Sequence, residues 1–186
     1  SIPKSYNSGW YGSLQRSLKR FGDFKSPDYL LSNTAVAERN FSGRIGINTY
    51  RFGLEANYSR FEKEAGIFRS SHVGGAEDLV VAIQSERPFI VAPFTYDIDT
   101  PRQEVTHQIA KIKGFYRIEN LGKWSAKYYY QKNKRVAVVI RIVSEARVPS
   151  IDLQVETVSL KNVFTYTSKK YITRKKGITR NYKKNL

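Results

Sequence analysis

At residues 54–59 the chain reads Leu54-Glu55-Ala56-Asn57-Tyr58-Ser59, in which apolar and polar side chains take alternate positions. A period of two is the signature of a β-strand. Residues 108–116, QIAKIKGFY, alternate again, with Lys111 and Lys113 on the polar side. The two runs predict neighbouring strands joined by a long loop, and loops of that length usually carry function.

Composition limits the class of protein. The 186 residues are enough for one domain with a core. Lys and Arg number 32 against 16 Asp and Glu, and the net charge of +16 predicts an anionic partner, whether nucleic acid, lipid headgroup, polysaccharide or small acid. Cysteine is absent, which excludes disulfides and thiolate metal sites. Methionine is absent as well, and the chain opens at Ser1, so we expect a processed chain or a piece of a longer one.

The sequence has no candidate for a membrane-spanning helix. No run reaches the roughly 18 apolar residues that such a helix needs, and the start has no signal-peptide pattern. Strands of a membrane barrel need only about 9 to 11 alternating residues. The 13 Tyr, 10 Phe and 2 Trp are ample for the aromatic girdles of a barrel.

The period of two recurs along the chain and predicts about seven strands. We expect them at residues 10–21, 41–49, from 54 onward, 106–118, 124–143 with a basic break at 132–135, 150–166 and 171–182. Pro149 predicts a further break, and residues 76–85 have the apolar spacing of a short helix. The expected fold is therefore all-β.

Short and long connections alternate between these strands. Short turns are expected at residues 50–53, 119–123 and 167–170, and they alternate with long loops at 22–39, 64–105 and roughly 132–149. An antiparallel up-and-down sheet places all the short turns at one end. Outer-membrane barrels have this asymmetry, with short periplasmic turns and longer outer loops.

The faces of the expected strands differ in polarity. The uncharged sets are Ile45/Ile47, Leu54/Ala56/Tyr58, Ala110/Ile112/Tyr116 and Trp124/Ala126/Tyr128/Tyr130. The polar sets are Glu55/Asn57, Lys111/Lys113 and Ser125/Lys127. The uncharged face is modest in bulk and ends in aromatics, as a lipid-facing surface does. We therefore predict an antiparallel up-and-down transmembrane β-barrel with the polar sets inside.

Several separated blocks then resemble one family. They are GRIGIN at residues 43–48, RFGLEA at 51–56, GIFRSSHVG at 66–74, TYDIDTPRQEVTH at 95–107 and KIKG at 111–114. Together they resemble the barrel of a TonB-dependent outer-membrane receptor of the ferric-siderophore or ferric-citrate type, over about residues 22–182. Residues 137–145 depart from the pattern, because they are apolar where the family is charged and glycine-rich.

The resemblance implies that residues 1–186 are a part of such a barrel. Complete members have about 22 strands and a plugged lumen, and neither a plug domain nor a coupling motif is visible in the chain. The implied location is the outer membrane of a Gram-negative cell. The implied partners are a ferric chelate or other small ligand, outer-membrane lipid, the plug domain and the inner-membrane protein that supplies energy.

The expected outer loop holds the candidate ligand residues. They are Arg69, Ser71, His72, Arg87, Tyr96, Arg102 and His107. Arginines would bind the carboxylates of an anionic iron chelate in bidentate fashion. The alternative is that Asp97, Asp99, Arg102 and Glu104 pair with one another and hold the loop's own fold.

The expected lumen wall holds Glu55, Asn57, Lys111, Lys113 and Lys127, which would steer an anionic ligand or face acidic groups of a plug. The two histidines have no ligand spacing, so we expect no protein-held metal and no cofactor, because a chelated iron arrives already coordinated. No nucleophile with a base, phosphate loop or carboxylate pair is present, and enzymatic function has no support.

Two other functions remain open. The basic segment at residues 169–184, with Tyr166, Tyr171 and Tyr182 for stacking, is typical of a soluble basic β-protein that binds nucleic acid. We favour lumen and rim lysines, and thus no nucleic acid. A small barrel closed by this chain alone would need an even strand count from eight upward, so about seven strands do not close without help.

Overall fold

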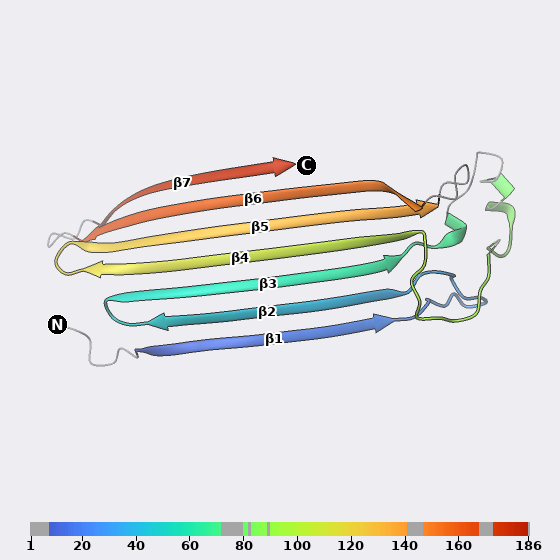
Figure 1. Cartoon of the computed structure of the whole chain (residues 1–186), viewed down its shortest axis with the longest axis horizontal. Helices are drawn as coiled ribbons and strands as arrows, with labels where there is room; N and C mark the ends of the chain where they lie inside the picture. The colour runs from blue at the N-terminus through green and yellow to red at the C-terminus, as the bar shows by residue number, and fades with distance from the viewer. Residues whose placement is uncertain are drawn as a thin grey trace.

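Seven strands form one antiparallel sheet in chain order (Figure 1). The computed structural model describes residues 8–71, 80–81, 83–88, 90–140, 147–167 and 173–185. The strands are β1 (Gly9–Phe21), β2 (Val36–Asn48), β3 (Phe52–Gly66), β4 (Arg102–Ile118), β5 (Gly122–Ile140), β6 (Arg147–Thr167) and β7 (Thr173–Asn185), and a short 3-10 helix, η1, covers Arg69–Ser71. The all-β, up-and-down architecture predicted from the period of two is confirmed.

The sheet is open. Strand β1 pairs with β2 and β7 pairs with β6, and the described strands include no pairing of β1 with β7. Figure 1 places β1 and β7 at opposite edges of the sheet. Each of these two strands therefore presents one edge of unpaired backbone groups, which a neighbouring strand would satisfy.

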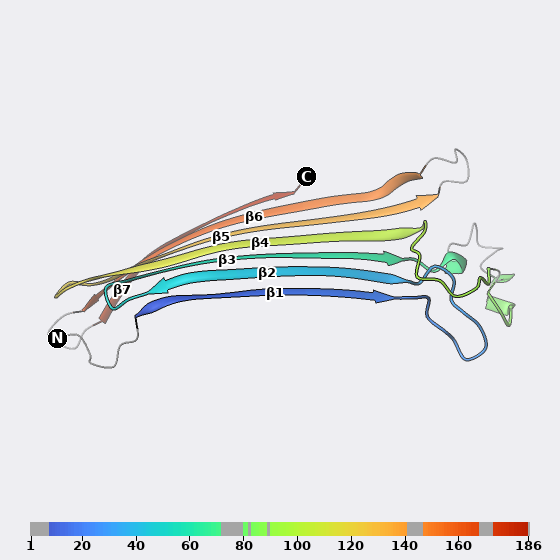
Figure 2. The ribbon, with the colours of Figure 1, turned by 60° about the horizontal axis from the view of Figure 1, so that its bottom comes forward.

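The sheet is also a single layer. Figure 2 shows the strands lying in one twisted layer, with the connecting segments gathered beyond the strand ends. Among the described residues, the buried apolar side chains are those of Ala35 and Ala137 alone. A sheet of this size in water normally buries one face against a second layer. The described chain supplies no such second layer on either face.

Three sequence predictions about strand ends were wrong. Strand β2 begins at Val36 rather than at residue 41, and β5 continues through the basic segment 132–135 without a break. Pro149 lies inside β6, at a register shift where Ala137 pairs with Ile151 and Val138 pairs with Pro149. This bulge leaves one extra residue on β6, and a bulge is a place where a strand accommodates proline.

The lengths of the connections follow the predicted rule with one correction. Residues 49–51 and 119–121 make short turns at one end of the sheet, and residues 22–35 and 67–101 make long loops at the other. The prediction of a third long loop was wrong. Strands β5 and β6 extend so far that only residues 141–146 separate them. Of the turn expected at 167–170, Thr167 belongs to β6, and residues 168–170, like 141–146, lie outside the described residues. Of the helix expected at 76–85, residues 80, 81, 83 and 84 are helical and 76–79 and 82 lie outside the described part.

Register places the predicted faces on opposite sides of the sheet. Directly paired residues on neighbouring strands share a face. One row across β2 to β6 is Ile45, Ala56, Ile112, Tyr128 and Leu160, and the row beside it on the other face is Gly46, Glu55, Lys113, Lys127 and Lys161. We call the side with Ile45 the apolar face and the side with Glu55 the polar face.

The two faces differ in how well their side chains are covered. On β3 and β4 the apolar face is the more exposed, with Leu54 at 54% and Ile112 at 48%, whereas Glu55 on the polar face is 9% exposed. Tyr11 and Lys113 contact the Glu55 carboxylate and cover it. The polar face is thus the better covered of the two on these strands.

We expect a methyl group at Gly122 to destabilise the β4–β5 turn. Gly122 has a φ of +145°, and an added Cβ would lie 2.1 Å from the carbonyl oxygen of Thr165 on β6. Strain of this kind costs about 1–3 kcal/mol, so Gly122→Ala lowers the urea midpoint of unfolding. Gly9→Ala is the matched control, since a Cβ at Gly9 meets nothing within 4 Å. Equal midpoints for the two variants would contradict the turn geometry.

Candidate functional site

The best-buried part of the described chain lies at the long-loop end of the sheet. The polar side chains buried there are those of Asp23 (6% exposed), Ser32 (1%), Asn33 (5%) and Thr100 (1%). They come from two loops far apart in sequence, residues 22–35 and 67–101. We call this cluster, together with Ala35, the loop junction.

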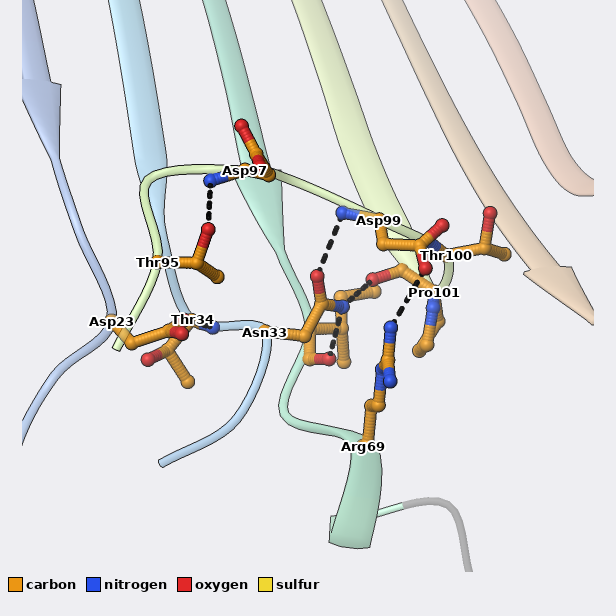
Figure 3. Close-up of polar contacts among 10 residues, drawn as sticks. Asp23, Asn33, Thr34, Arg69, Thr95, Asp97, Asp99, Thr100 and Pro101 are labelled. Atoms are coloured by element: carbon orange, nitrogen blue, oxygen red, sulfur yellow. Dashed lines mark hydrogen bonds and ion pairs between the residues drawn. The ribbon is translucent and has the colours of Figure 1, made fainter. Parts of the chain in front are cut away.

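Asn33 ties three segments of the loop junction together (Figure 3). Its Nδ2 donates hydrogen bonds to the carbonyl oxygens of Ile67 at 2.9 Å and Pro101 at 2.8 Å. Its Oδ1 accepts a hydrogen bond from the backbone N–H of Asp99 at 2.8 Å. The φ of Asn33 is 59°, a left-handed conformation that asparagine adopts more readily than most residues.

Further hydrogen bonds of the loop junction continue this arrangement. The backbone N–H of Gly66 donates to Ala35 O at 2.9 Å, and that of Ile67 donates to Pro101 O at 2.8 Å. Asp23 accepts a hydrogen bond from the Thr34 N–H at 2.7 Å, while its own N–H donates to Thr95 O at 3.0 Å. The two loops are therefore held as one unit above the strand ends.

Two of the predicted ligand arginines are engaged in ion pairs. Arg69 Nη2 lies 2.7 Å from Asp99 Oδ2. Arg102 Nε lies 2.9 Å from Glu104 Oε1 and 3.3 Å from Glu64 Oε1. The hydrogen bond with Glu104 raises the pKa of Arg102 above its ordinary value, so the guanidinium is charged at every accessible pH. These contacts match the alternative in which charged loop residues hold the loop's own fold.

The other predicted loop residues are dispersed. Tyr96 is 49% exposed and lies edge-on to Phe94, with its ring 5.6 Å from the Arg20 guanidinium carbon. Arg87 is exposed on the same loop. Arg102 and His107 belong to β4 rather than to the loop, because the strand begins four residues before residue 106. Ser71 ends η1, and His72 lies outside the described residues.

The polar face of the sheet holds the predicted lumen residues together. Glu55 accepts a hydrogen bond from Tyr11 Oη at 2.7 Å and lies 2.9 Å from Lys113 Nζ. Lys113 is followed in the same row by Lys127, and Lys111 lies in the next row on the same face. Of these lysines, Lys113 alone forms a described ion pair with Glu55. The excess positive charge is on this face, where an anionic molecule would be attracted.

Asn57 has a structural contact on the polar face, since its Nδ2 donates to the carbonyl oxygen of Gly43 at 3.4 Å. His107 is on the same face, and its Nε2 is buried without a hydrogen-bond partner among the described residues. Asn40 on β2 lies in the same row as His107, two strands away. Its Oδ1 is also buried without a hydrogen-bond partner among the described residues.

Among the described residues, no group of three or more His, Cys, Asp or Glu side chains could hold a metal ion. None of the helices described is both long enough and apolar enough to cross a membrane. No protein-family model, curated protein or solved structure matches the chain.

We expect Asn33→Gly to loosen the loop junction without straining the backbone. Glycine tolerates the positive φ, but it removes the three side-chain hydrogen bonds, each worth about 1 kcal/mol. The amide of Asp99, which donates to Asn33 Oδ1, should then exchange with solvent deuterium about tenfold faster or more.

Asn120→Gly is the matched control for Asn33→Gly. Asn120 also has a positive φ, 60°, but it lies in the β4–β5 turn at the opposite end of the sheet. This variant should leave exchange at Asp99 unchanged. If both variants accelerate exchange equally, Asn33 does not hold the loops together.

Proposed function

We propose that the chain is part of the wall of a transmembrane β-barrel, in a TonB-dependent outer-membrane receptor that takes up a ferric chelate. The observation that carries the proposal is the uncovered apolar face of a sheet whose opposite face is polar and better covered. Leu54, Ile112 and Ile45, which is 59% exposed, would have no cover in water. Lipid chains would supply that cover.

Aromatic rows bound the apolar face at both ends. Nearer the short turns, one row contains Phe52, Tyr116, Trp124 and Phe164. Nearer the loops, another contains Tyr58 and Tyr130 on either side of Ala110. From Tyr116 to Ala110 the strand rises about 20 Å at about 3.3 Å per residue. With the reach of the aromatic rings this is close to the apolar band of about 25 Å in outer-membrane barrels.

The strands are longer than a membrane requires. They run from 13 residues in β1 to 21 in β6, whereas about 9 to 11 tilted residues span a bilayer. The extra length lies on the side of the long loops. There the apolar face becomes charged, with Arg102 paired to Glu64 and Lys134 Nζ 3.5 Å from Asp152 Oδ2. This supports strands that project from the membrane on the loop side, as the outer side of a receptor barrel does.

The charge of the polar face supports an anionic cargo. Lys111 and Lys127 have no ion pair with any residue that the structure describes, in contrast to Lys113. Uncompensated lysines on the inner wall would raise the local concentration of an anion such as a ferric carboxylate chelate. Iron in such a chelate is already coordinated, so the wall needs no metal ligands of its own.

The open edges support a larger assembly. A barrel has no edges in the membrane, because an unpaired backbone group in hydrocarbon costs several kcal/mol. Strands β1 and β7 would each pair with a further strand of the complete receptor. A plug domain and an inner-membrane protein that supplies energy belong to the same proposal.

The first test is partition. We expect the protein in its native cells to remain in the outer-membrane fraction after washing with alkaline carbonate, and to be released by detergent. The reason is that an apolar face of this size favours lipid over water. Recovery in the aqueous fraction, with a salt-dependent shift of a nucleic-acid probe, would overturn the proposal in favour of a soluble nucleic-acid binder.

The second test is cargo association. Replacing both Lys111 and Lys127 by Gln should slow association of ferric citrate about tenfold at low salt and have little effect at about 0.5 M salt, because steering by charge is screened. The control variant Arg16→Gln/Arg39→Gln removes the same number of charges from the opposite face. It should leave the association rate unchanged. Equal slowing by both double variants would mean that net charge, and not the polar face, attracts the anion.

A further inference from the structure

Two basic side chains lie opposite each other on the polar face, at the short-turn end of the sheet. Arg117 near the end of β4 pairs in register with Lys123 near the start of β5. Both occupy the same alternate positions as Lys113 and Lys127, so they share the polar face. Like charges placed directly opposite each other on neighbouring strands destabilise the pair. This end of the polar face therefore carries a charge that needs compensation.

The described chain does not supply that compensation. In the short-turn half of the sheet, the acidic residues that the structure describes are Glu55 and Glu119 alone. Both are engaged elsewhere, because Glu55 pairs with Lys113 and Glu119 Oε1 lies 3.1 Å from Arg51 Nη2. The two opposed cations form no ion pair with any described residue.

An aromatic ring holds the two cations close together. Lys123 Nζ lies 4.2 Å from the centre of the Phe115 ring, and the Arg117 guanidinium carbon lies 5.8 Å from the same centre. The guanidinium carbon is also 5.0 Å from the ring centre of Tyr50 in the β2–β3 turn. An aromatic ring attracts a cation through its quadrupole but carries no net charge. Phe115 therefore holds both cations without neutralising either.

The Phe115 ring has its place because β3 carries a glycine beside it. Gly53 pairs in register with Phe115, and a Cβ at Gly53 would collide with the ring. Beyond the ring, Arg117 Nε is buried and has no hydrogen-bond partner among the described residues. A buried donor without a partner is costly. The guanidinium thus receives neither an ion pair nor a hydrogen bond at Nε from the described chain.

We propose that Arg117 and Lys123, held by Phe115, bind a small oxyanion through a carboxylate or phosphate group. We call these three residues the turn-end site. The oxyanion supplies the missing negative charge and replaces a repulsive pair by charge-assisted contacts. Arginine offers a planar fork that matches two oxygens, and lysine offers a point charge beside it. The site goes beyond the proposed function, because it needs neither a membrane nor an iron chelate.

A second pair of opposed lysines on the same face lacks this preparation. Lys127 and Lys161 pair in register across β5 and β6, and both are exposed. No ring that the structure describes contacts either of them. Their side chains keep their rotamer freedom, so fixing them on an anion costs more entropy than at the turn-end site. This pair is therefore a matched control for charge on the polar face.

The test titrates the intact protein, in a neutral detergent at low salt, by isothermal calorimetry. Citrate and inorganic phosphate are the probes, and chloride at equal ionic strength is the reference. We expect Arg117→Gln/Lys123→Gln to weaken binding of the tighter probe about tenfold or more, and Lys127→Gln/Lys161→Gln to weaken it by about twofold at most. Phe115→Leu keeps both charges but loses the ring, and it should lie between the two.

The two probes distinguish the two sources of an oxyanion. Tighter binding of citrate assigns the turn-end site to carboxylates such as those of the proposed cargo, and tighter binding of phosphate assigns it to the free anion. The site is overturned if neither probe binds the wild-type protein better than chloride, or if both double variants lose binding equally. Neither result bears on the membrane placement, which the carbonate wash tests separately.

Discussion

The ladder of backbone hydrogen bonds between neighbouring strands is the interaction on which the whole structure depends. It runs without interruption from β1 to β7, apart from the one register shift at Ala137 and Val138. In an antiparallel ladder each interior strand satisfies its N–H and C=O groups through its two neighbours. The sheet can therefore persist with almost no buried apolar side chains among the described residues. In a medium that offers no hydrogen-bonding partners, backbone N–H and C=O groups need a ladder of this kind.

Once the ladder is fixed, the side chains can only be divided between two faces. The polar face gathers Glu55, Lys113 and Tyr11 into a hydrogen-bonded group in which Glu55 is buried. The apolar face spreads Leu54 and Ile112 outward. A soluble protein would enclose the apolar face instead, because burial of apolar area drives folding in water. The difference in cover between the two faces is thus the main support for the proposed lipid environment.

The strands could be predicted wherever one face is apolar, and so could ends such as Phe21 and Ile118, but several loop-side ends could not. Leu54 to Ser59 alternates plainly because alternate residues meet different surroundings. Beyond the loop-side aromatic row polar and apolar side chains are mixed on both faces, as in Val36-Ala37-Glu38-Arg39, so the period of two disappears from the sequence although the backbone continues unchanged. That is why the start of β2 at Val36 and the continuity of β5 through residues 132–135 were missed. A period of two indicates that the two faces of a strand meet different environments. It does not detect a strand whose two faces are alike.

The sequence did not predict the loop junction, and the reason there is different. Ser32-Asn33-Thr34 predicts a turn from local chemistry, but its partners at residues 67, 99 and 101 are not visible from spacing. An arginine in sequence likewise does not reveal whether it meets a ligand or a neighbouring carboxylate. In the folded chain Arg69 and Arg102 meet carboxylates, so their charge is already compensated. The case for an anionic cargo therefore rests on Lys111 and Lys127, because an unpaired cation on the covered face attracts an anion more strongly than a paired one at the rim.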